Sequence, residues 1–99
     1  MTKEARIALR TIRDSLEDGR YVVTAHFSER MDERGLMWPD VLCAVESPTD
    51  VRDDGLDRIG RPKWIVAGPT SDDFPIEIVC VLDQDASGTT TVLITLYWE

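Results

Sequence analysis

The stretch RPKWIVAGPT (residues 61–70) begins the part of the chain that decides the fold. Two stretches of the same kind follow it, PIEIVCVLD (75–83) and TTVLITLYWE (90–99). All three are rich in β-branched and aromatic residues, and the segments PTSDDFP and QDASG between them carry turn-forming residues. Because these connections are short, we predict three neighbouring antiparallel strands.

Upstream of residue 61 the apolar residues instead recur at helical spacing. Residues 2–18 carry a stripe of Ala5, Ala8, Leu9, Ile12 and Leu16, and Gly19 stands where a helix stop belongs. Thr24 can cap a second helix, which we expect to run to about Arg34 and to close at Gly35. The pattern therefore predicts two helices separated by a short β-rich segment, Tyr21-Val22-Val23.

A third helix is predicted within LMWPDVLCAVESP (36–48). Pro39 and Asp40 suit its first turn and Pro48 ends it. Its expected apolar face consists of Val41, Leu42 and Val45. The segment TDVRDDGLDRIGRP (49–62) is rich in turn residues, and we expect it to carry a hairpin.

The order of these elements indicates an α+β domain. We predict amino-terminal helices packed on one face of a three- to four-stranded antiparallel sheet. A chain of 99 residues can form one such core, so residues 1–99 are expected to be a single domain.

Charge and composition exclude several classes of protein. The net charge of −8 argues against non-specific binding of nucleic acid. All eleven Lys and Arg residues lie between Lys3 and Lys63, so an anion site must come from the first two thirds of the chain. The apolar runs are too short to span a membrane and the first twenty residues are too charged for a signal peptide, so we expect a cytoplasmic protein.

No metal or cofactor motif is apparent. Cys43 and Cys80 lie in apolar contexts and are expected to be small buried hydrophobes. The segment DVRDDGLD resembles a calcium loop, but arginine stands at two positions that need oxygen ligands. There is also no glycine loop for phosphate, so we expect neither a metal nor a cofactor.

The helix AHFSERMDERG (25–35) carries the first candidate site. Spacings of four place His26, Arg30 and Arg34 on one side, bordering the apolar residues Phe27 and Met31. A site here requires that His26, Arg30 and Arg34 line a shared cleft with Arg61 or Lys63. In the alternative interpretation, both helix arginines form ion pairs with acids of the turn segment, namely Asp53, Asp54 or Asp57.

A second basic cluster lies in DRIGRPKW (57–64), where the first long strand begins. Strand alternation places Arg61 and Lys63 on one face and Trp64 on the other, with Arg58 nearby. Arginines can neutralise the charge of a phosphodiester under attack, and a histidine can move a proton near neutral pH. The alternative is an ordinary solvent-facing sheet edge.

Several segments together resemble a known group of proteins. These are HFSERMDERGL, WPDVLCAVESP, DGLDRIGRPKWIVAG, IEIVCVLD and TVLITLYWE, within residues 20–99. They resemble a widespread uncharacterised bacterial family that is grouped with RelE/BrnT-like toxins. The element order is similar to that of the MqsR mRNA interferase, and RGLxxxDV and PxxVRxD resemble BrnT.

This resemblance implies a RelE/BrnT-like fold and a metal-independent ribonuclease that an antitoxin neutralises. Such sites combine Arg, Lys, His and Tyr side chains on or beside the sheet. The residues of this chain that could fill those roles are His26, Arg30, Arg34, Arg61, Lys63 and Tyr97. The expected partners are RNA and a zinc-finger or helix-turn-helix antitoxin, while the sequence leaves a homodimer open.

The charge of the chain supports a second hypothesis. These toxins are commonly basic, whereas this chain is acidic, which favours a non-catalytic protein-interaction module of the same fold. Residues 64–99 contain no Lys or Arg, and acids such as Asp72, Asp73 and Asp85 would attract a basic partner.

Overall fold

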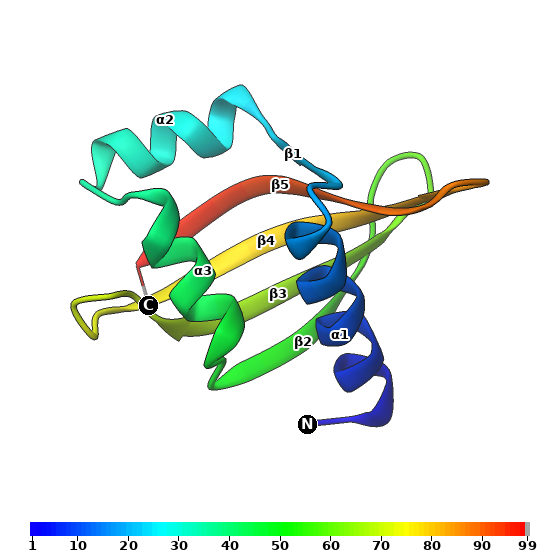
Figure 1. The fold of residues 1–99 in the computed structure, drawn as a ribbon, viewed down its shortest axis with the longest axis horizontal. Coiled ribbons are helices and arrows are strands. Elements are labelled where there is room, and N and C mark those ends of the chain that lie inside the picture. Colours follow the sequence, from blue (N-terminus) through cyan, green and yellow to red (C-terminus); the bar gives the residue numbers. More distant parts are fainter. Residues whose placement is uncertain (99) are drawn as a thin grey trace.

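The computed structural model of the protein describes residues 1–98 and contains three helices and five strands in that range (Figure 1). In chain order these are α1 (Lys3–Glu17), β1 (Tyr21–Val23), α2 (Ala25–Glu33), α3 (Trp38–Glu46), β2 (Asp50–Leu56), β3 (Pro62–Pro69), β4 (Pro75–Asp85) and β5 (Gly88–Trp98). The predicted α+β class and the three helices are confirmed. No helix within residues 1–98 combines the length and apolar character needed to cross a membrane.

The sheet is larger than predicted and partly parallel. Its strand order is β1-β5-β4-β3-β2, in which β2 to β5 form an antiparallel meander and β1 pairs in parallel with β5. The predicted antiparallel meander is confirmed in β2 to β5, but the prediction missed the fifth strand, β1, and its parallel pairing with β5. After α1 the chain runs alongside β5, so the short segment Tyr21–Val23 pairs with that strand. Just before this segment, the Arg20 carbonyl accepts a hydrogen bond from the Thr91 amide at 3.1 Å.

The turn-rich segment before residue 61 also proves to be partly a strand. β2 is an edge strand, and Val51 is its single buried residue, opposite Val66 of β3. The expected hairpin is present, because β2 and β3 pair on either side of the turn that follows Leu56. The acids and Gly55 lie within its edge strand, which needs little apolar surface.

The helix ends follow the predicted caps. Hydroxyl oxygens of Thr2 and Thr24 accept hydrogen bonds from the third residue of their helices at 3.0 and 3.2 Å. The Asp40 carboxylate accepts from the Met37 amide at 2.8 Å, and this bond is the main reason why the pKa of Asp40 is lowered. Gly35 follows α2 with a φ of +64°, a conformation that glycine adopts without strain.

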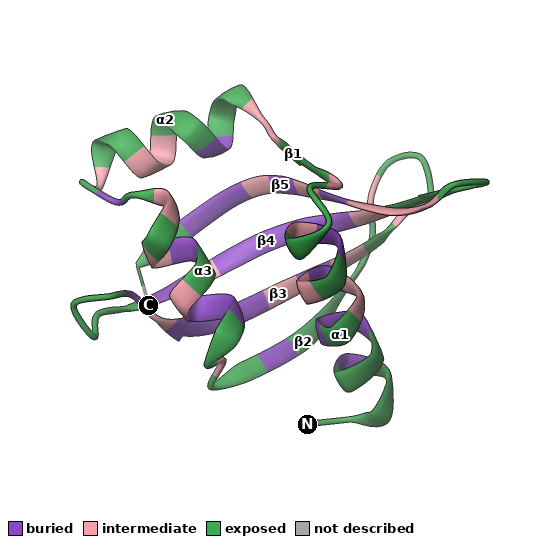
Figure 2. Ribbon diagram, in the orientation of Figure 1, coloured by how far each residue is buried: buried purple, intermediate pink, exposed green. Residues whose placement is uncertain are grey.

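The core lies between the sheet and the helices, with α1 and α3 over one face and α2 along the β5 edge (Figures 1 and 2). Its largest fully buried side chains include Ile12, Phe27, Val41, Ile76, Ile78, Leu93 and Leu96. Helix α3 approaches β3 so closely that a Cβ on Gly68 would lie 2.5 Å from the Ala44 carbonyl oxygen. Contrary to prediction, Leu42 is exposed and Cys43 is only half-buried, whereas Cys80 is buried as expected.

Candidate functional site

The face of the sheet turned away from α1 and α3, here called the open face, carries two of the candidate residues, Lys63 and Tyr97. Lys63 pairs with Val81, and Tyr97 pairs with Glu77, so these side chains share a face opposite to that of Trp64 and Leu96 in the core. The predicted separation of Arg61 and Lys63 from Trp64 is consistent with this register.

A bulge in β5 extends the open face toward α2. Cys80 pairs with Leu93, but Val79 pairs with Thr95, which leaves Ile94 as the extra residue. Thr95 consequently shares the open face with Val79, although alternation from Leu93 alone would put it on the core side. Bulges of this kind change the direction of a side chain, and the Thr95 side chain contacts His26, the first residue of the candidate stripe on α2.

His26 is the centre of the first cluster. Its exposed imidazole lies with Nε2 3.1 Å from the Thr95 hydroxyl and 3.5 Å from Nε of Arg30. An arginine N–H can only donate, so Nε2 is the acceptor in this arrangement and a neutral ring carries its proton on Nδ1. The structure thus brings together His26, Arg30 and Thr95, with the single lone pair of Nε2 facing the Arg30 guanidinium.

The two arginines of the stripe share an acid on their own helix. Nη1 of Arg30 lies 2.9 Å from Glu33, and Nη1 of Arg34 lies 3.7 Å from the same carboxylate oxygen. The alternative interpretation, in which acids of the turn segment pair with these arginines, is therefore wrong about the partners. Phe27 is buried as that stripe predicted, while Met31 is half-buried.

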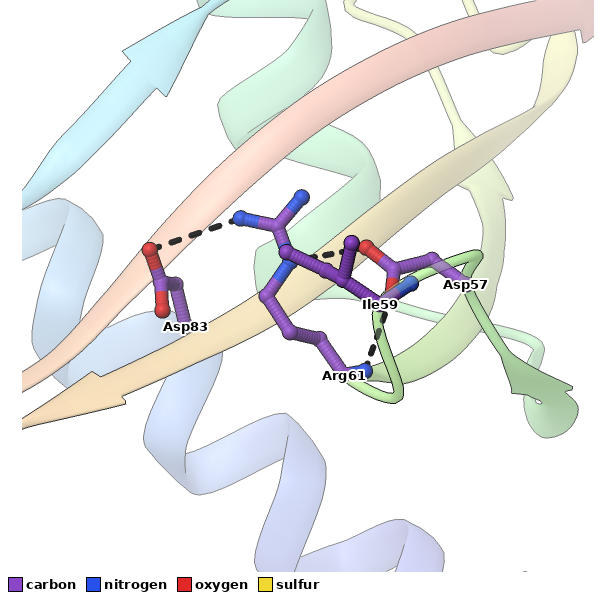
Figure 3. Close-up of polar contacts among 4 residues, drawn as sticks. All are labelled: Asp57, Ile59, Arg61 and Asp83. Atoms are coloured by element: carbon purple, nitrogen blue, oxygen red, sulfur yellow. Dashed lines mark hydrogen bonds and ion pairs between the residues drawn. The ribbon is translucent and has the colours of Figure 1, made fainter.

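The turn acids pair with the second basic cluster instead (Figure 3). The Asp57 carboxylate accepts from the backbone amide and Nε of Arg61 at 2.8 and 2.7 Å, and from the Ile59 amide at 3.1 Å. Nη1 of Arg61 lies 3.4 Å from Asp83, and Nζ of Lys63 lies 3.5 Å from Asp54. These hydrogen bonds, first of all the one from the Arg61 amide, lower the pKa of Asp57, and Asp57 raises that of Arg61.

Beneath this turn lies a cavity of about 420 Å³ that opens on the open face. Its apolar lining is formed by Leu56, Ile59, Val81 and Ile94, and its polar lining by Asp57, Arg58, Arg61 and Lys63. His26, Arg30 and Arg34 are not among the lining residues, so the predicted cleft shared by both basic clusters is not this cavity. The two are nevertheless neighbours, because Ile94 of the cavity precedes Thr95, which contacts His26.

One family profile, described as a domain of unknown function (DUF4258), matches residues 23–98. The chain belongs to the DUF4258 family. No curated protein matches the chain. The family description carries no activity and no link to RelE- or BrnT-like toxins, so that resemblance remains a proposal.

The DUF4258 match includes both clusters and the whole open face, and it omits α1. Tyr97 lies within it on the open face, two residues beyond Thr95, and its side chain is 47% exposed. Thr95, Ile94 and the structural role of Asp57 were not predicted from the sequence. Strand alternation would have placed Thr95 in the core, and nothing in the sequence indicated the bulge that turns it to the open face.

The chemistry available in this DUF4258 domain is that of acid–base groups and cations. Within residues 1–98, no group of three or more His, Cys, Asp or Glu side chains is arranged to hold a metal ion. An imidazole, a tyrosine hydroxyl and guanidinium groups are the side chains that could act on a bound phosphodiester.

Proposed function

We propose that this DUF4258 protein is a metal-independent RNA endonuclease, a type II toxin of the mRNA-interferase kind, which cuts RNA at the open face. The observation that supports this most directly is the exposed His26 imidazole, whose Nε2 accepts beside the Arg30 guanidinium and the Thr95 hydroxyl. A base and a cation side by side are the minimum that phosphodiester attack by an internal nucleophile requires.

The proposed reaction is an attack by a ribose 2′-hydroxyl on its own 3′-phosphate. His26 takes the 2′ proton on Nε2, the 2′-oxygen forms a bond to phosphorus, and the bond from phosphorus to the 5′-oxygen breaks. The 5′-oxygen leaves with a proton, which we assign to the Tyr97 hydroxyl on the same face. The products are a 2′,3′-cyclic phosphate and a 5′-hydroxyl, and proton transfer from His26 restores Tyr97.

Arg30 and Arg34 on α2, with Lys63 from the second cluster, would stabilise the extra negative charge on the phosphate. Arg30 is the nearest to His26, although Glu33 neutralises it in part. A phosphate would compete with that exposed carboxylate for the same N–H groups, and exposed ion pairs of this kind are weak enough to exchange partners. Arg34 shares the Glu33 carboxylate with Arg30, which partly neutralises its charge. Arg61 and Lys63 border the adjacent cavity.

The proposal is tested with purified protein and end-labelled single-stranded RNA in the presence of EDTA. We expect cleavage to 2′,3′-cyclic ends, and a loss of about 10²–10⁴-fold in rate for His26→Asn, the range attributed to one general base. Ser28→Ala, an exposed change on the same helix, serves as the matched control. Wild-type protein that neither cuts RNA nor slows growth on induced expression would contradict the proposal, as would His26→Asn cutting at the wild-type rate.

A protein-interaction module without nuclease activity is the second candidate, and an exposed aromatic pair supports it. Phe74 and Trp98 contact each other edge to face with centroids 6.3 Å apart, and both are about half exposed or more. Asp72 and Asp73 precede Phe74 in the β3–β4 connection, whereas Asp85 lies at the other end of β4 (Figure 1). The acids of the final third are therefore divided between two ends of the sheet, and only one end has aromatic anchors suited to a basic partner.

The partner to test is a zinc-finger or helix-turn-helix protein encoded beside this gene. Under the interaction hypothesis, Phe74→Ala abolishes co-purification, and reversal of Asp72 and Asp73 makes the remaining binding insensitive to salt. Reversal of Asp85 is the matched control, because it lies at the opposite end. Binding that survives Phe74→Ala would contradict this surface.

A further inference from the structure

We propose that the 420 Å³ cavity on the open face is a subsite for one nucleobase of the RNA, and that Arg61 reads the base there. This inference rests on the proposed RNA substrate. The volume of the cavity lies within the range of small-ligand sites, and the cavity combines apolar walls with a few fixed polar groups.

The walls expose apolar surface that only a ligand could cover. Leu56 and Ile59 line the cavity with exposed fractions of 65% and 75%, whereas Val81 at the floor is 1% exposed. The turn above the sheet therefore hides the floor but leaves its own apolar side chains in water. A flat aromatic ring inserted between them would bury apolar area on both of its faces.

Hydrogen bonds to Asp57 hold the turn in this shape. Besides the three bonds its carboxylate accepts, its own amide donates to the Arg61 carbonyl at 2.9 Å and its carbonyl accepts from the Gly60 amide at 3.1 Å. A cavity whose cover is fixed by so many local bonds requires little ordering when a ligand binds, which favours affinity.

Arg61 is suited to a neutral base more than to a phosphate. Asp57 and Asp83 already compensate its charge through Nε and Nη1, while Nη2 makes no hydrogen bond within residues 1–98 (Figure 3). Nη1 has a second N–H besides the one directed at Asp83, and together with an N–H of Nη2 it fits the adjacent O6 and N7 acceptors of guanine, which makes guanine the preferred base. Arg58 lines the same cavity and forms no ion pair within residues 1–98, so it is the group for the phosphate of that nucleotide.

The cavity also lies beside His26, the residue proposed to act on the RNA, as a substrate subsite should. Ile94 forms its wall, and the next residue, Thr95, contacts His26. A nucleotide whose base occupies the cavity would thus lie beside the phosphate that the proposed reaction attacks.

The test is an NMR titration with mononucleotides, which the proposed nuclease cannot cleave, so the result does not depend on catalysis. Protein with ¹³C-labelled methyl groups is titrated with GMP, AMP, CMP, UMP and ribose 5-phosphate, each at millimolar concentration. We expect shifts of the Ile59, Val81 and Ile94 methyls, with GMP binding the tightest and ribose 5-phosphate several-fold weaker. Arg61→Lys, which keeps the charge and loses the planar N–H pair, should abolish the preference for GMP.

A second variant keeps the test valid if Arg61→Lys disturbs the turn. The Ile59 side chain makes no hydrogen bond, so Ile59→Ala removes apolar contact alone and should weaken GMP binding several-fold. Ile7→Ala, which changes another mostly exposed isoleucine (58%, against 75% for Ile59) on α1, is the matched control and should bind as wild type does. Absent methyl shifts, equal binding of ribose 5-phosphate and GMP, or unchanged binding by Ile59→Ala would each overturn the proposal, even if the protein proves to be a nuclease.

Discussion

The two faces of the sheet hide their apolar side chains by different means. On the helix-covered face, Ile78 is buried under helices whose contacts with the sheet are mainly apolar, apart from the buried hydroxyl pair of Ser15 and Thr91. On the open face Val81 is just as buried, but its cover includes a short turn that Asp57 and Arg61 hold together. One face is therefore closed by packing and the other by charged hydrogen bonds, so the two should respond to different perturbations.

The largest contrast is expected in the reactivity of the two thiols. Burial raises the pKa of Cys80, on the helix-covered face, to about 12, whereas Cys43 is partly exposed on α3. Cys80 should react only when the domain opens globally, so a thiol reagent should label it at least about 10³-fold more slowly than Cys43. Labelling kinetics by mass spectrometry measure this ratio, and equal rates in native buffer would contradict a closed core.

Removing a large side chain from the helix-covered face should cost the most stability. Phe27 is fully buried between α2 and the sheet, so Phe27→Ala should lower the free energy of unfolding by about 3–5 kcal/mol. Urea denaturation followed by Trp fluorescence measures the loss. Ile59→Ala on the open face is the comparison and should change stability by no more than about 0.5 kcal/mol; similar losses for both would remove the distinction between the faces.

Adding a methyl group on the helix-covered face should have a smaller but clear effect. Gly68→Ala would place a Cβ 2.5 Å from the Ala44 carbonyl oxygen, and a backbone atom cannot rotate away. Overpacking of this kind costs about 1–3 kcal/mol. A thermal melt would show it, and an unchanged melting temperature would mean that α3 can move away from β3 at no cost.

The smallest effect is an acid transition confined to the open face. Because the folded-state pKa of Asp57 is lowered from its ordinary value of 3.8, its bonds stabilise the turn fully above that pH. This stabilisation is lost as the pH falls through the lowered value. NMR should therefore show the Ile59 and Arg61 amides shifting below pH 3.8 while Trp64 in the core is unchanged, and Asp57→Asn should remove the transition.

The sequence predicted well those elements whose pattern is set by their own residues. Apolar stripes, the Thr24 cap and the glycine and proline stop signals located all three helices, and alternation located β3, β4 and β5. It indicated a β-rich segment at 21–23 and a hairpin at 49–62, but it did not show how β1 and β2 join the sheet, because a strand at the edge of a sheet is defined by the strand it joins. Tyr21–Val23 is too short to reveal its parallel pairing, and Val51 is the only residue of β2 that had to be apolar.

The candidate site was predicted in its parts but not in its connections. The sequence placed Arg61 and Lys63 on one face and His26 beside Arg30, and the structure agrees. It could not show which acids pair with which arginines, because Asp57 and Glu33 each bind the nearest cation once the backbone has folded. The contact of His26 with Thr95 depends on a β-bulge that no residue pattern in the sequence indicated.

The edges of the sheet set a limit on how copies of the chain could associate. At one side of the sheet, β1 offers only three residues and α2 lies along the part of β5 that follows them; at the other, β2 offers seven. Within residues 1–98, a strand from a second molecule could thus pair over a useful length at β2 alone. Growth of a fibril needs two such edges on every molecule, and a chain with one can only terminate growth. Association through strands would stop at a pair, and the acids of β2 would oppose even that step.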